Sequence, residues 1–387
     1  MKLQNIPSSL AGTRAAGRLR VVSDLRMVTA TRGLRRDGKE YIVFNSNDYL
    51  GMTHEEEVVE AARRAMAFGT GSGGARLTSG AVFELSELEK ELAAFKHADD
   101  AVIFNTGYMT NLGVLYALAD KGDVIFSDAL NHASIVDGCR ISKARTVVYK
   151  HSDMEDLARK LKETTCDGQR FIVTDGVFSM DGDVAPLPEL LQLKRKYDAC
   201  LIVDDAHAVG VIGETGRGTA EYFHEIGIDI QVGTLSKSLG AEGGYAATTA
   251  PIAAYLRNHS RPFIFSTSIS ASTGAAALAA LRLLQRDPDR FVGRLHRNTA
   301  YLKEKLAAAG ISVLPGDTSI LPIILGEEKK TLAYAKACQD RGILLSAIRP
   351  PSVPEGTSRI RLTVTAAHTI GELELAADVL CKVWQQA

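Results

Sequence analysis

The chain has 387 residues, of which 45% are hydrophobic and 24% charged, and its formal net charge is -1. This length exceeds that of a usual single domain, and the composition is close to that of average soluble proteins, which disfavours disordered, fibrous and membrane-spanning classes. A net charge near zero provides no global positive field and no basic patch is evident, so we expect no nucleic-acid partner.

The five cysteines are widely spaced, with no CxxC pair and no Cys/His grouping at zinc spacing. We therefore expect a reduced, cytoplasmic protein without a metal site. No apolar run approaches the roughly 18 residues that a transmembrane helix needs, and no apolar signal region follows Lys2, so we expect neither a membrane partner nor secretion. Four basic residues precede the first carboxylate at Asp24. Organelle transit peptides share this feature, but they are also rich in serine.

The first predicted helices span residues 55–68 and 86–95. Between them, residues 69–74 satisfy the GxGxxG pattern of dinucleotide-binding sites. Such a site requires a strand before the glycines, whereas here a helical pattern precedes them. We therefore expect these glycines to permit a close approach of the backbone.

Short apolar strands alternate with helices over the middle of the chain, and the predicted strands are 101–104, 123–126, 170–174, 200–203 and 228–233. This alternation predicts an α/β fold in which crossover helices join mostly parallel strands. Ligands of open α/β sheets bind beyond the carboxyl ends of the strands. The residues that follow each strand are therefore the first candidates for a site.

In chain order, three groups of residues that follow these strands are candidates. Thr106, Gly107 and Tyr108 form a turn that opens a helix, whose N–H groups would hold a phosphate. His132 follows the next strand and would stack over an aromatic ring, although a structural histidine remains an alternative. Ser179 follows residues 170–174 within a run of aspartates and glycines, where the alternative is a polar turn.

That run also resembles a calcium-binding loop. A twelve-residue calcium loop ends in glutamate, but counting from Asp181 places Gln192 at position 12. We therefore expect no calcium site.

The last two strands of the series lead to the strongest candidates. Asp204 stands at the tip of the strand 200–203, and His207 follows three residues later, so both can point into one crevice. Lys237 follows the strand 228–233 and is flanked by small and hydroxyl residues. A lysine that forms a Schiff base needs such neighbours, together with partial desolvation that lowers its pKa. The alternative for Lys237 alone is a surface lysine in a loop.

After about residue 284 the pattern changes to amphipathic helices with two short strands at 320–325 and 359–364 and a final helix from Ile370. This change predicts a separate α+β lobe. We expect an N-terminal segment at 1–50, a large domain at 51–284 and a C-terminal domain at 285–387.

Five segments together resemble the α-oxoamine synthase family of fold-type I pyridoxal-phosphate (PLP) enzymes. They are SNDYLG at 46–51, LNHAS at 130–134, VDDAH at 203–207, GETGRG at 213–218 and TLSKSLGAEG at 234–243. The resemblance covers about residues 45–368 and implies a large, mostly parallel sheet domain with a C-terminal α+β lobe. It departs from the family at Asp175, where many members have glutamate.

The resemblance implies the roles of the cofactor site. Lys237 would bind the PLP aldehyde as a Schiff base, Asp204 would pair with the pyridinium nitrogen, His207 would bind the ring hydroxyl and His132 would stack on the ring. The phosphate would be held or framed by Thr106, Gly107, Tyr108, Thr234, Ser266 and Thr267. In the family the last pair comes from the neighbouring subunit, so we expect a homodimer with its active site at the interface.

The resemblance also implies the substrate contacts. Arg361, with Asn47 and Ser179, would hold the amino-acid carboxylate, a task that suits the guanidinium fork. Arg20 would contact the acyl substrate, with Arg18 and Arg14 as alternatives, and it would be joined in this by Arg349 and Ser352.

The substrates follow from the C-terminal stretch 347–363. It resembles members that join L-alanine to a pimeloyl thioester, carried on coenzyme A or on acyl carrier protein. Residues 127–132 and 261–265 resemble, almost equally well, the members that use glycine and an acetyl thioester. That pair of substrates remains the alternative.

Overall fold

The structure is a computed structural model that describes residues 2–386. It divides into two compact units. The large unit comprises Asn47–Ser179 and Asp183–His296, and the small unit comprises the residues up to Ser46, Met180–Gly182 and the residues from Arg297 onward.

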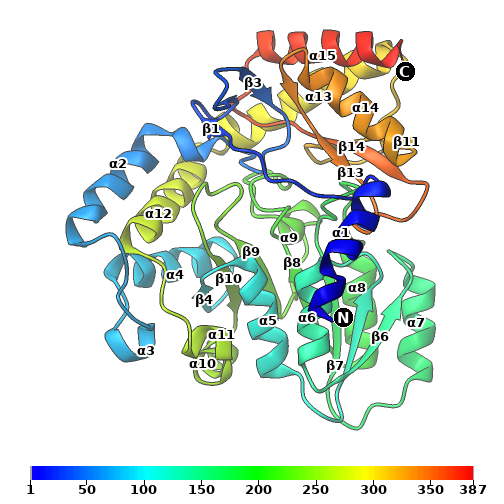
Figure 1. The fold of residues 1–387 in the computed structure, drawn as a ribbon. Helices are drawn as coiled ribbons and strands as arrows, with labels where there is room; N and C mark the ends of the chain where they lie inside the picture. The colour runs from blue at the N-terminus through cyan, green and yellow to red at the C-terminus, as the bar shows by residue number, and fades with distance from the viewer. Residues whose placement is uncertain (1, 387) are drawn as a thin grey trace. The chain divides into compact units, whose positions relative to one another are not determined.

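The large unit is built on a seven-stranded sheet in the order β4-β10-β9-β8-β7-β5-β6 (Figure 1). In that order the strands are Asp100–Phe104, Gly244–Thr248, Ile230–Thr234, Ala199–Asp204, Arg170–Asp175, Val124–Asp128 and Arg145–Tyr149. Only β10 is antiparallel to its neighbours, β4 and β9. The sheet confirms the predicted mostly parallel α/β fold.

Both faces of this sheet are buried, which explains the continuous apolar runs of its strands. Successive side chains point to opposite faces. On β7, Phe171 and Val173 join one core with α5 and α6, whereas Ile172 joins another core with α7 and α8. These four helices are Gly107–Leu118, Ala133–Ile141, Met154–Glu163 and Leu187–Tyr197. The crossover helices thus cover both faces, as Figure 1 shows.

The remaining helices of the large unit include a group in which α12 packs on α2 and α4. The bounds of these helices are α2 Glu56–Ala65, α3 Arg76–Ser79, α4 Phe83–Phe95, α9 Thr219–Tyr222, α10 Ala250–His259, α11 Arg261–Ile264 and α12 Ala271–Arg286, with short helical turns at Met52–His54, Met66–Phe68 and Asp289–Gly293. A helical turn, not a strand, precedes the glycine-rich run 69–74. The predicted helical pattern before the glycines is therefore confirmed.

The small unit contains two sheets, ordered β1-β2-β3-β12 and β11-β14-β13. Their strands are β1 Arg26–Met27, β2 Arg32–Leu34, β3 Glu40–Val43, β11 Ile320–Gly326, β12 Ile343–Leu344, β13 Ser346–Ile348 and β14 Ser358–Thr363. Its helices are α1 Ile6–Ala15, α13 Arg294–Ala308, α14 Glu328–Gln339 and α15 Ile370–Trp384, with a short turn at Leu3–Asn5. Helix α15 begins where predicted, because Thr369 and Glu372 form a capping box.

Among residues 2–386, no helix is both long and apolar enough to cross a bilayer.

Candidate active site

The centre of the candidate site lies at the carboxyl ends of β7 and β8. Asp175 and Asp204 are the last residues of these strands and lie opposite each other in the ladder. By the alternation of side chains, Asp204 shares the face of Ile202, which packs in the core with α5. Two carboxylates therefore face the helix that begins at Gly107.

Asp204 is buried and held in place by two hydrogen bonds. The side-chain amide of Asn111 on α5 donates to Oδ2 at 2.6 Å, and the backbone N–H of Ala206 donates to Oδ1 at 2.9 Å. These two bonds fix the position of both carboxylate oxygens at the end of β8.

A chain of polar contacts connects Asp204 to His132, the N-cap residue of α6. Asn111 Nδ2 also lies 2.9 Å from Ser134 Oγ, which lies 2.7 Å from His132 Nδ1. Because the amide donates to the hydroxyl, the hydroxyl proton is directed to Nδ1, which assigns the remaining proton of a neutral imidazole to Nε2.

The charge state of His132 agrees with this assignment. Burial lowers the pKa of His132, Asp204 raises it, and Lys237 lowers it. The sequence did not single out Asn111 and Ser134. Asn111 lies three residues after Tyr108, and Ser134 lies two residues after His132.

Asp175 anchors the loop that carries His132. Its Oδ2 accepts the backbone N–H of His132 at 2.7 Å. Burial and the nearby charge of Asp204 raise its pKa well above the ordinary value, while the bond from His132 and the charge of Lys237 lower it. Asp175 thus positions His132. Although many family members have glutamate here, the aspartate carboxyl still makes this hydrogen bond.

His207 lies in the turn after β8 and contacts Tyr49. The Tyr49 hydroxyl is 2.6 Å from His207 Nδ1, and the two rings form a T-shaped contact with 6.0 Å between centroids. Tyr49 is fully buried. Tyr49 thus fixes the orientation of the His207 imidazole. Tyr49 belongs to the segment 46–51 that resembles the α-oxoamine synthases.

Lys237 follows β9 and is half-buried. Its charge acts on both His132 and Asp175, which places it with the predicted ring-binding residues. Thr234 Oγ1 donates to the Gly243 carbonyl at 2.8 Å and lies 2.8 Å from Ser236 Oγ. These bonds hold the turn that presents Lys237.

The predicted phosphate site at the start of α5 has a defined cap. The Thr106 hydroxyl accepts the N–H of Met109 at 3.0 Å. A β-carbon on Gly107 would lie 3.3 Å from Thr234, so the helix approaches the Thr234 turn closely at this glycine. The first N–H groups of a helix lack intrahelical acceptors and attract anions.

Tyr108 differs from a simple phosphate ligand. Its hydroxyl donates to Asp137, and its ring lies edge-on to His132, 6.3 Å between centroids. The role of Tyr108 at the phosphate stays a prediction, and its hydroxyl is already bonded to Asp137.

Ser266 and Thr267 follow α11, next to the start of α5 in the same chain. The Asn105 side-chain amide donates to the Thr267 carbonyl at 2.6 Å. The assignment of this pair to the phosphate of a neighbouring subunit stays a prediction.

The small unit holds four of the predicted substrate residues, Arg20, Arg349, Ser352 and Arg361, whereas Asn47 and Ser179 belong to the large unit. Arg361 on β14 is buried and donates to Thr363 Oγ1 at 3.2 Å. On the same strand, buried Arg359 pairs with Asp181. The sequence did not single out Arg359. Its pairing gives Asp181, an aspartate of the run that resembles a calcium-binding loop, a structural role.

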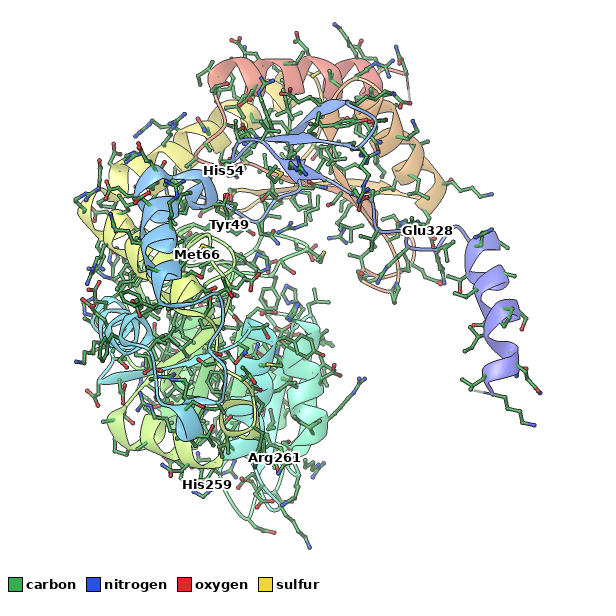
Figure 2. All side chains as sticks on the ribbon, turned by 60° about the vertical axis from the view of Figure 1, so that its left-hand side comes forward. Tyr49, His54, Met66, His259, Arg261 and Glu328 are labelled. Atoms are coloured by element: carbon green, nitrogen blue, oxygen red, sulfur yellow. The ribbon has the colours of Figure 1, made fainter. Side chains whose placement is uncertain are left out.

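The structure brings together the three residues predicted for the acyl substrate. Arg20 donates to Ser352 Oγ at 3.1 Å, and Arg349 donates to the Gly17 carbonyl. Arg18 instead pairs with Glu328 at 2.9 Å and Glu355 at 3.2 Å. Figure 2 shows Glu328 beside the chain that leads from α1. The assignment of Arg20 to the acyl substrate stays a prediction.

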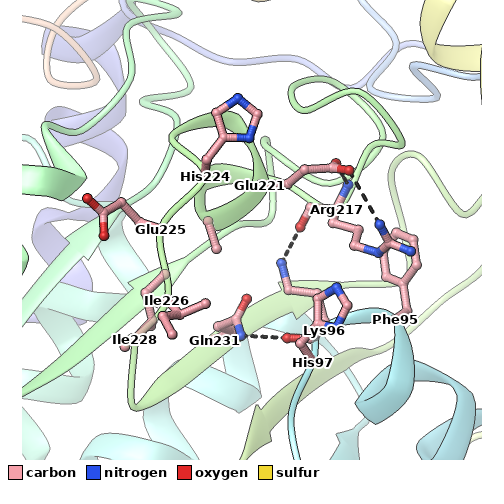
Figure 3. A pocket seen from close by; sticks show the side chains of 12 residues that line it. Phe95, Lys96, His97, Arg217, Glu221, His224, Glu225, Ile226, Ile228 and Gln231 are labelled. Carbon is pink, nitrogen blue, oxygen red and sulfur yellow. Dashed lines mark hydrogen bonds and ion pairs between the residues drawn. The ribbon is translucent and has the colours of Figure 1, made fainter.

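A cavity of about 250 Å³ in the large unit lies apart from these residues (Figure 3). Its lining includes Lys96, whose ammonium donates to the Arg217 carbonyl and pairs with Asp205 at 2.7 Å. None of the predicted site residues lines this cavity. Within residues 2–386 no group of three or more His, Cys, Asp or Glu side chains is placed to hold a metal ion.

The arrangement in the large unit fits PLP. It combines a buried carboxylate with fixed donors, an accessible lysine, an imidazole on the N-terminus of α6 and a helix N-terminus for an anion. These are the groups needed for the ring nitrogen, the aldehyde, the ring face and the phosphate.

The family model for aminotransferase class I and II matches residues 39–380. The chain belongs to this family. Its similarity to an 8-amino-7-oxononanoate synthase of Lysinibacillus sphaericus is 45% identity over 352 residues, 90% of each chain. It is also 47% identical over 339 residues, 87% of each chain, to 8-amino-7-oxononanoate synthase 2 of Bacillus subtilis (strain 168).

Solved structures also match the fold. Serine palmitoyltransferase of S. paucimobilis, solved with a PLP–myriocin adduct, has a TM-score of 0.93 at 31% identity, covering 100% of this chain and 99% of that one. An 8-amino-7-oxononanoate synthase of Francisella tularensis has a TM-score of 0.76 at 28% identity, covering 89% and 98%. The fold-type I transferase fold and the resemblance to α-oxoamine synthases are thereby confirmed.

Proposed function

We propose that this chain catalyses the PLP-dependent decarboxylative condensation of L-alanine with a pimeloyl thioester, the reaction of 8-amino-7-oxononanoate synthases in biotin biosynthesis. The main support for this chemistry is the buried Asp204, which Asn111 holds at the end of β8. Lys237 follows the neighbouring strand β9. The substrates are supported by relatives of that name at 45% and 47% identity over most of the chain. The protein would therefore be an acyltransferase.

PLP, when bound, supplies an electron sink for the electrons that remain at the amino-acid α-carbon after its proton departs. Asp204 keeps the ring nitrogen protonated, and Asn111 keeps Asp204 in position. His132 would lie against the ring face, and Nε2 of His207 would bind the ring hydroxyl, because the Tyr49 hydroxyl contacts Nδ1. The amides that open α5 hold the phosphate, with Thr234 beside them.

Lys237 would hold the cofactor, and its amine, when free, would take the α-proton of the amino acid. Arg361, with Asn47 and Ser179, holds the alanine carboxylate so that the α-hydrogen is presented to this amine. The overall reaction would join the alanine α-carbon to the thioester carbonyl carbon, release the thiol of coenzyme A or carrier protein and carbon dioxide, and return a proton to the α-carbon. Arg20, Arg349 and Ser352 bind the pimeloyl chain or its thioester.

We further propose a cytoplasmic homodimer in which Ser266 and Thr267 complete the phosphate site of the partner. The five cysteines are free thiols in the structure, which agrees with a reducing compartment.

A second candidate is 2-amino-3-ketobutyrate CoA ligase (glycine C-acetyltransferase), favoured by the segments at 127–132 and 261–265 that resemble it almost equally.

The experiment that decides between them is a matrix of steady-state rates. Alanine, glycine and serine are each combined with pimeloyl, acetyl and palmitoyl thioesters, and released thiol is measured. The proposal predicts the highest kcat/KM for alanine with the pimeloyl thioester. A higher value for glycine with the acetyl thioester would establish the ligase activity instead.

A further inference from the structure

His151, a histidine outside the predicted site, lies between two acidic side chains of the large unit. Its Nδ1 is 3.0 Å from Asp128 Oδ1, and its Nε2 is 2.9 Å from Asp183 Oδ2. A neutral imidazole has only one N–H, so it would turn a lone pair toward one of the two carboxylates. Both bonds can be made only when the ring is protonated at both nitrogens.

Asp128 connects this histidine to the loop that carries His132. It is the last residue of β5, and its side chain is almost fully buried. Besides His151, its carboxylate accepts the N–H of Leu130 at 2.8 Å and that of Ser152 at 2.9 Å. Asp128 thereby fixes the start of the β5–α6 loop, four residues before His132, the predicted cofactor ligand.

Asp183 connects the histidine to the loop that carries Ser179. The backbone of Phe178 donates to the Asp183 carbonyl at 3.0 Å, and Val177 and Val184 form an antiparallel bridge. These contacts form the neck of the β7–α8 loop, and Ser179 follows Phe178 directly. The ring of His151 also meets Phe178 edge-on, 4.4 Å between centroids.

The backbone next to His151 shows that this geometry is enforced. Ser152 has a φ of 50°, in the left-handed region that side chains with a β-carbon disfavour. Its N–H is the donor to Asp128 Oδ2. Such a conformation persists where the surrounding contacts over-determine it, often close to functional sites.

We propose that His151 is a positioning residue that, as an imidazolium, ties the β5–α6 loop carrying His132 to the β7–α8 loop carrying Ser179. Its importance for catalysis rests on the proposed function, in which both loops serve the cofactor and the alanine carboxylate. The link itself is a property of the protein alone.

The electrostatics of the site agree with this link. Burial alone would lower the pKa of His151, but the hydrogen bonds and charges of Asp128 and Asp183 outweigh it and raise the pKa to about 10. These two carboxylates, one from β5 and one from the β7–α8 loop, are the charged groups that act on the ring. Because the folded pKa lies above the unfolded one, the stabilisation is complete below about pH 6.5 and is lost as the pH rises through about 10.

The first test measures the link without reference to activity. Imidazole resonances of the full-length protein, free of added cofactor, are titrated by NMR, and His151 is assigned by comparison with His151→Gln. We expect His151 to stay charged at pH 8 in the unmodified protein. Asp183→Asn should bring its pKa down toward the ordinary value, because an amide does not require the second proton.

The second test measures the two loops by amide hydrogen exchange. His151→Gln should speed exchange in both residues 129–134 and residues 176–179, since a neutral amide cannot bridge two carboxylates. The matched control is His259→Gln on α10, an exposed histidine that Figure 2 shows far from Tyr49 in the large unit; exchange in both loops should be unchanged.

The results separate the link from the function. Deprotonation of His151 near its ordinary pKa, or faster exchange confined to residues 150–153, would overturn the proposal. If His151→Gln does not fold, the titration of the unmodified protein and of Asp183→Asn still decides. If both tests succeed, His151→Gln should also exchange the alanine α-proton about tenfold more slowly while still binding PLP. A chain that fails to condense alanine with any acyl thioester would refute the proposed function but leave the titration and exchange results standing.

Discussion

At the scale of single residues, the site depends on a carboxylate that must remain charged and fixed. Asp204 meets this requirement through Asn111, which also connects it to His132 through Ser134. Removing the charge without changing the shape of residue 204 is therefore the sharpest perturbation of the site.

We expect Asp204→Asn to retain bound PLP and lose exchange of the alanine α-proton. An amide cannot hold the proton on the ring nitrogen as firmly, so the electron sink is weakened while the phosphate and lysine contacts remain. Cofactor content by absorbance and loss of deuterium from labelled alanine measure the two effects. A normal exchange rate in this variant would remove Asp204 from the role assigned to it.

Two arginines of the small unit should fail in different steps. Arg361→Ala should weaken alanine binding by about 1.5 to 3 kcal/mol, the loss expected for a charge-assisted hydrogen bond. Arg349→Ala should mainly impair the step with the acyl donor. Titration with alanine by absorbance, followed by addition of pimeloyl thioester, separates these steps. The division of labour would be refuted by equal losses of alanine affinity in both variants.

At the scale of elements, a buried ion pair connects the end of α4 to the turn after β8. The side chains of Lys96 and Asp205 are 1% and 0% exposed, and Asp205 also accepts the hydroxyl of Thr219. Because Asp205 directly follows Asp204, this pair supports the strand end from the opposite face of the sheet.

We expect Lys96→Met to reduce the free energy of unfolding by about 3 to 5 kcal/mol, because it leaves an uncompensated buried charge. Lys96→Met combined with Asp205→Asn should recover part of this loss, since the unpaired charge is then removed. Urea denaturation of both variants provides the measurement. A loss below about 1 kcal/mol for Lys96→Met would show that water or another cation already compensates Asp205.

The elements that could be predicted from the sequence are those whose pattern is set by burial on both faces. The central strands β7 and β8 are uninterrupted apolar runs, and the chemically active residues follow them directly. Strand β10 was not predicted, because Gly244, Ala246 and Ala247 give it little apolar bulk. The short strands β1, β2 and β12 pair over only two or three residues, too few for a recognisable period.

The same limit applies to the candidate site. Residues in recognised segments, such as Asp204 and Lys237, could be found because their neighbours along the chain are distinctive. Asn111 and His151 could not, because their partners are 93 and 23 or more residues away in the sequence, and only the fold brings them together. The division of the chain into three domains stays a prediction.

At the scale of the whole molecule, the proposed homodimer can be tested by mixing inactive chains. One chain carries Lys237→Ala, and the other carries Ser266→Ala with Thr267→Ala. If Ser266 and Thr267 serve the partner, the mixed dimer contains one intact site, and we expect about half of the activity of the unmodified dimer. If the pair serves its own chain, no intact site forms and activity is not recovered.

The most direct test of the account is to identify the lysine that binds PLP. The unmodified protein is loaded with PLP, reduced with borohydride, digested and analysed by mass spectrometry. We expect one pyridoxyl group per chain, attached to Lys237, and no attachment in Lys237→Ala. Attachment to another lysine in the unmodified protein, or none, would contradict it.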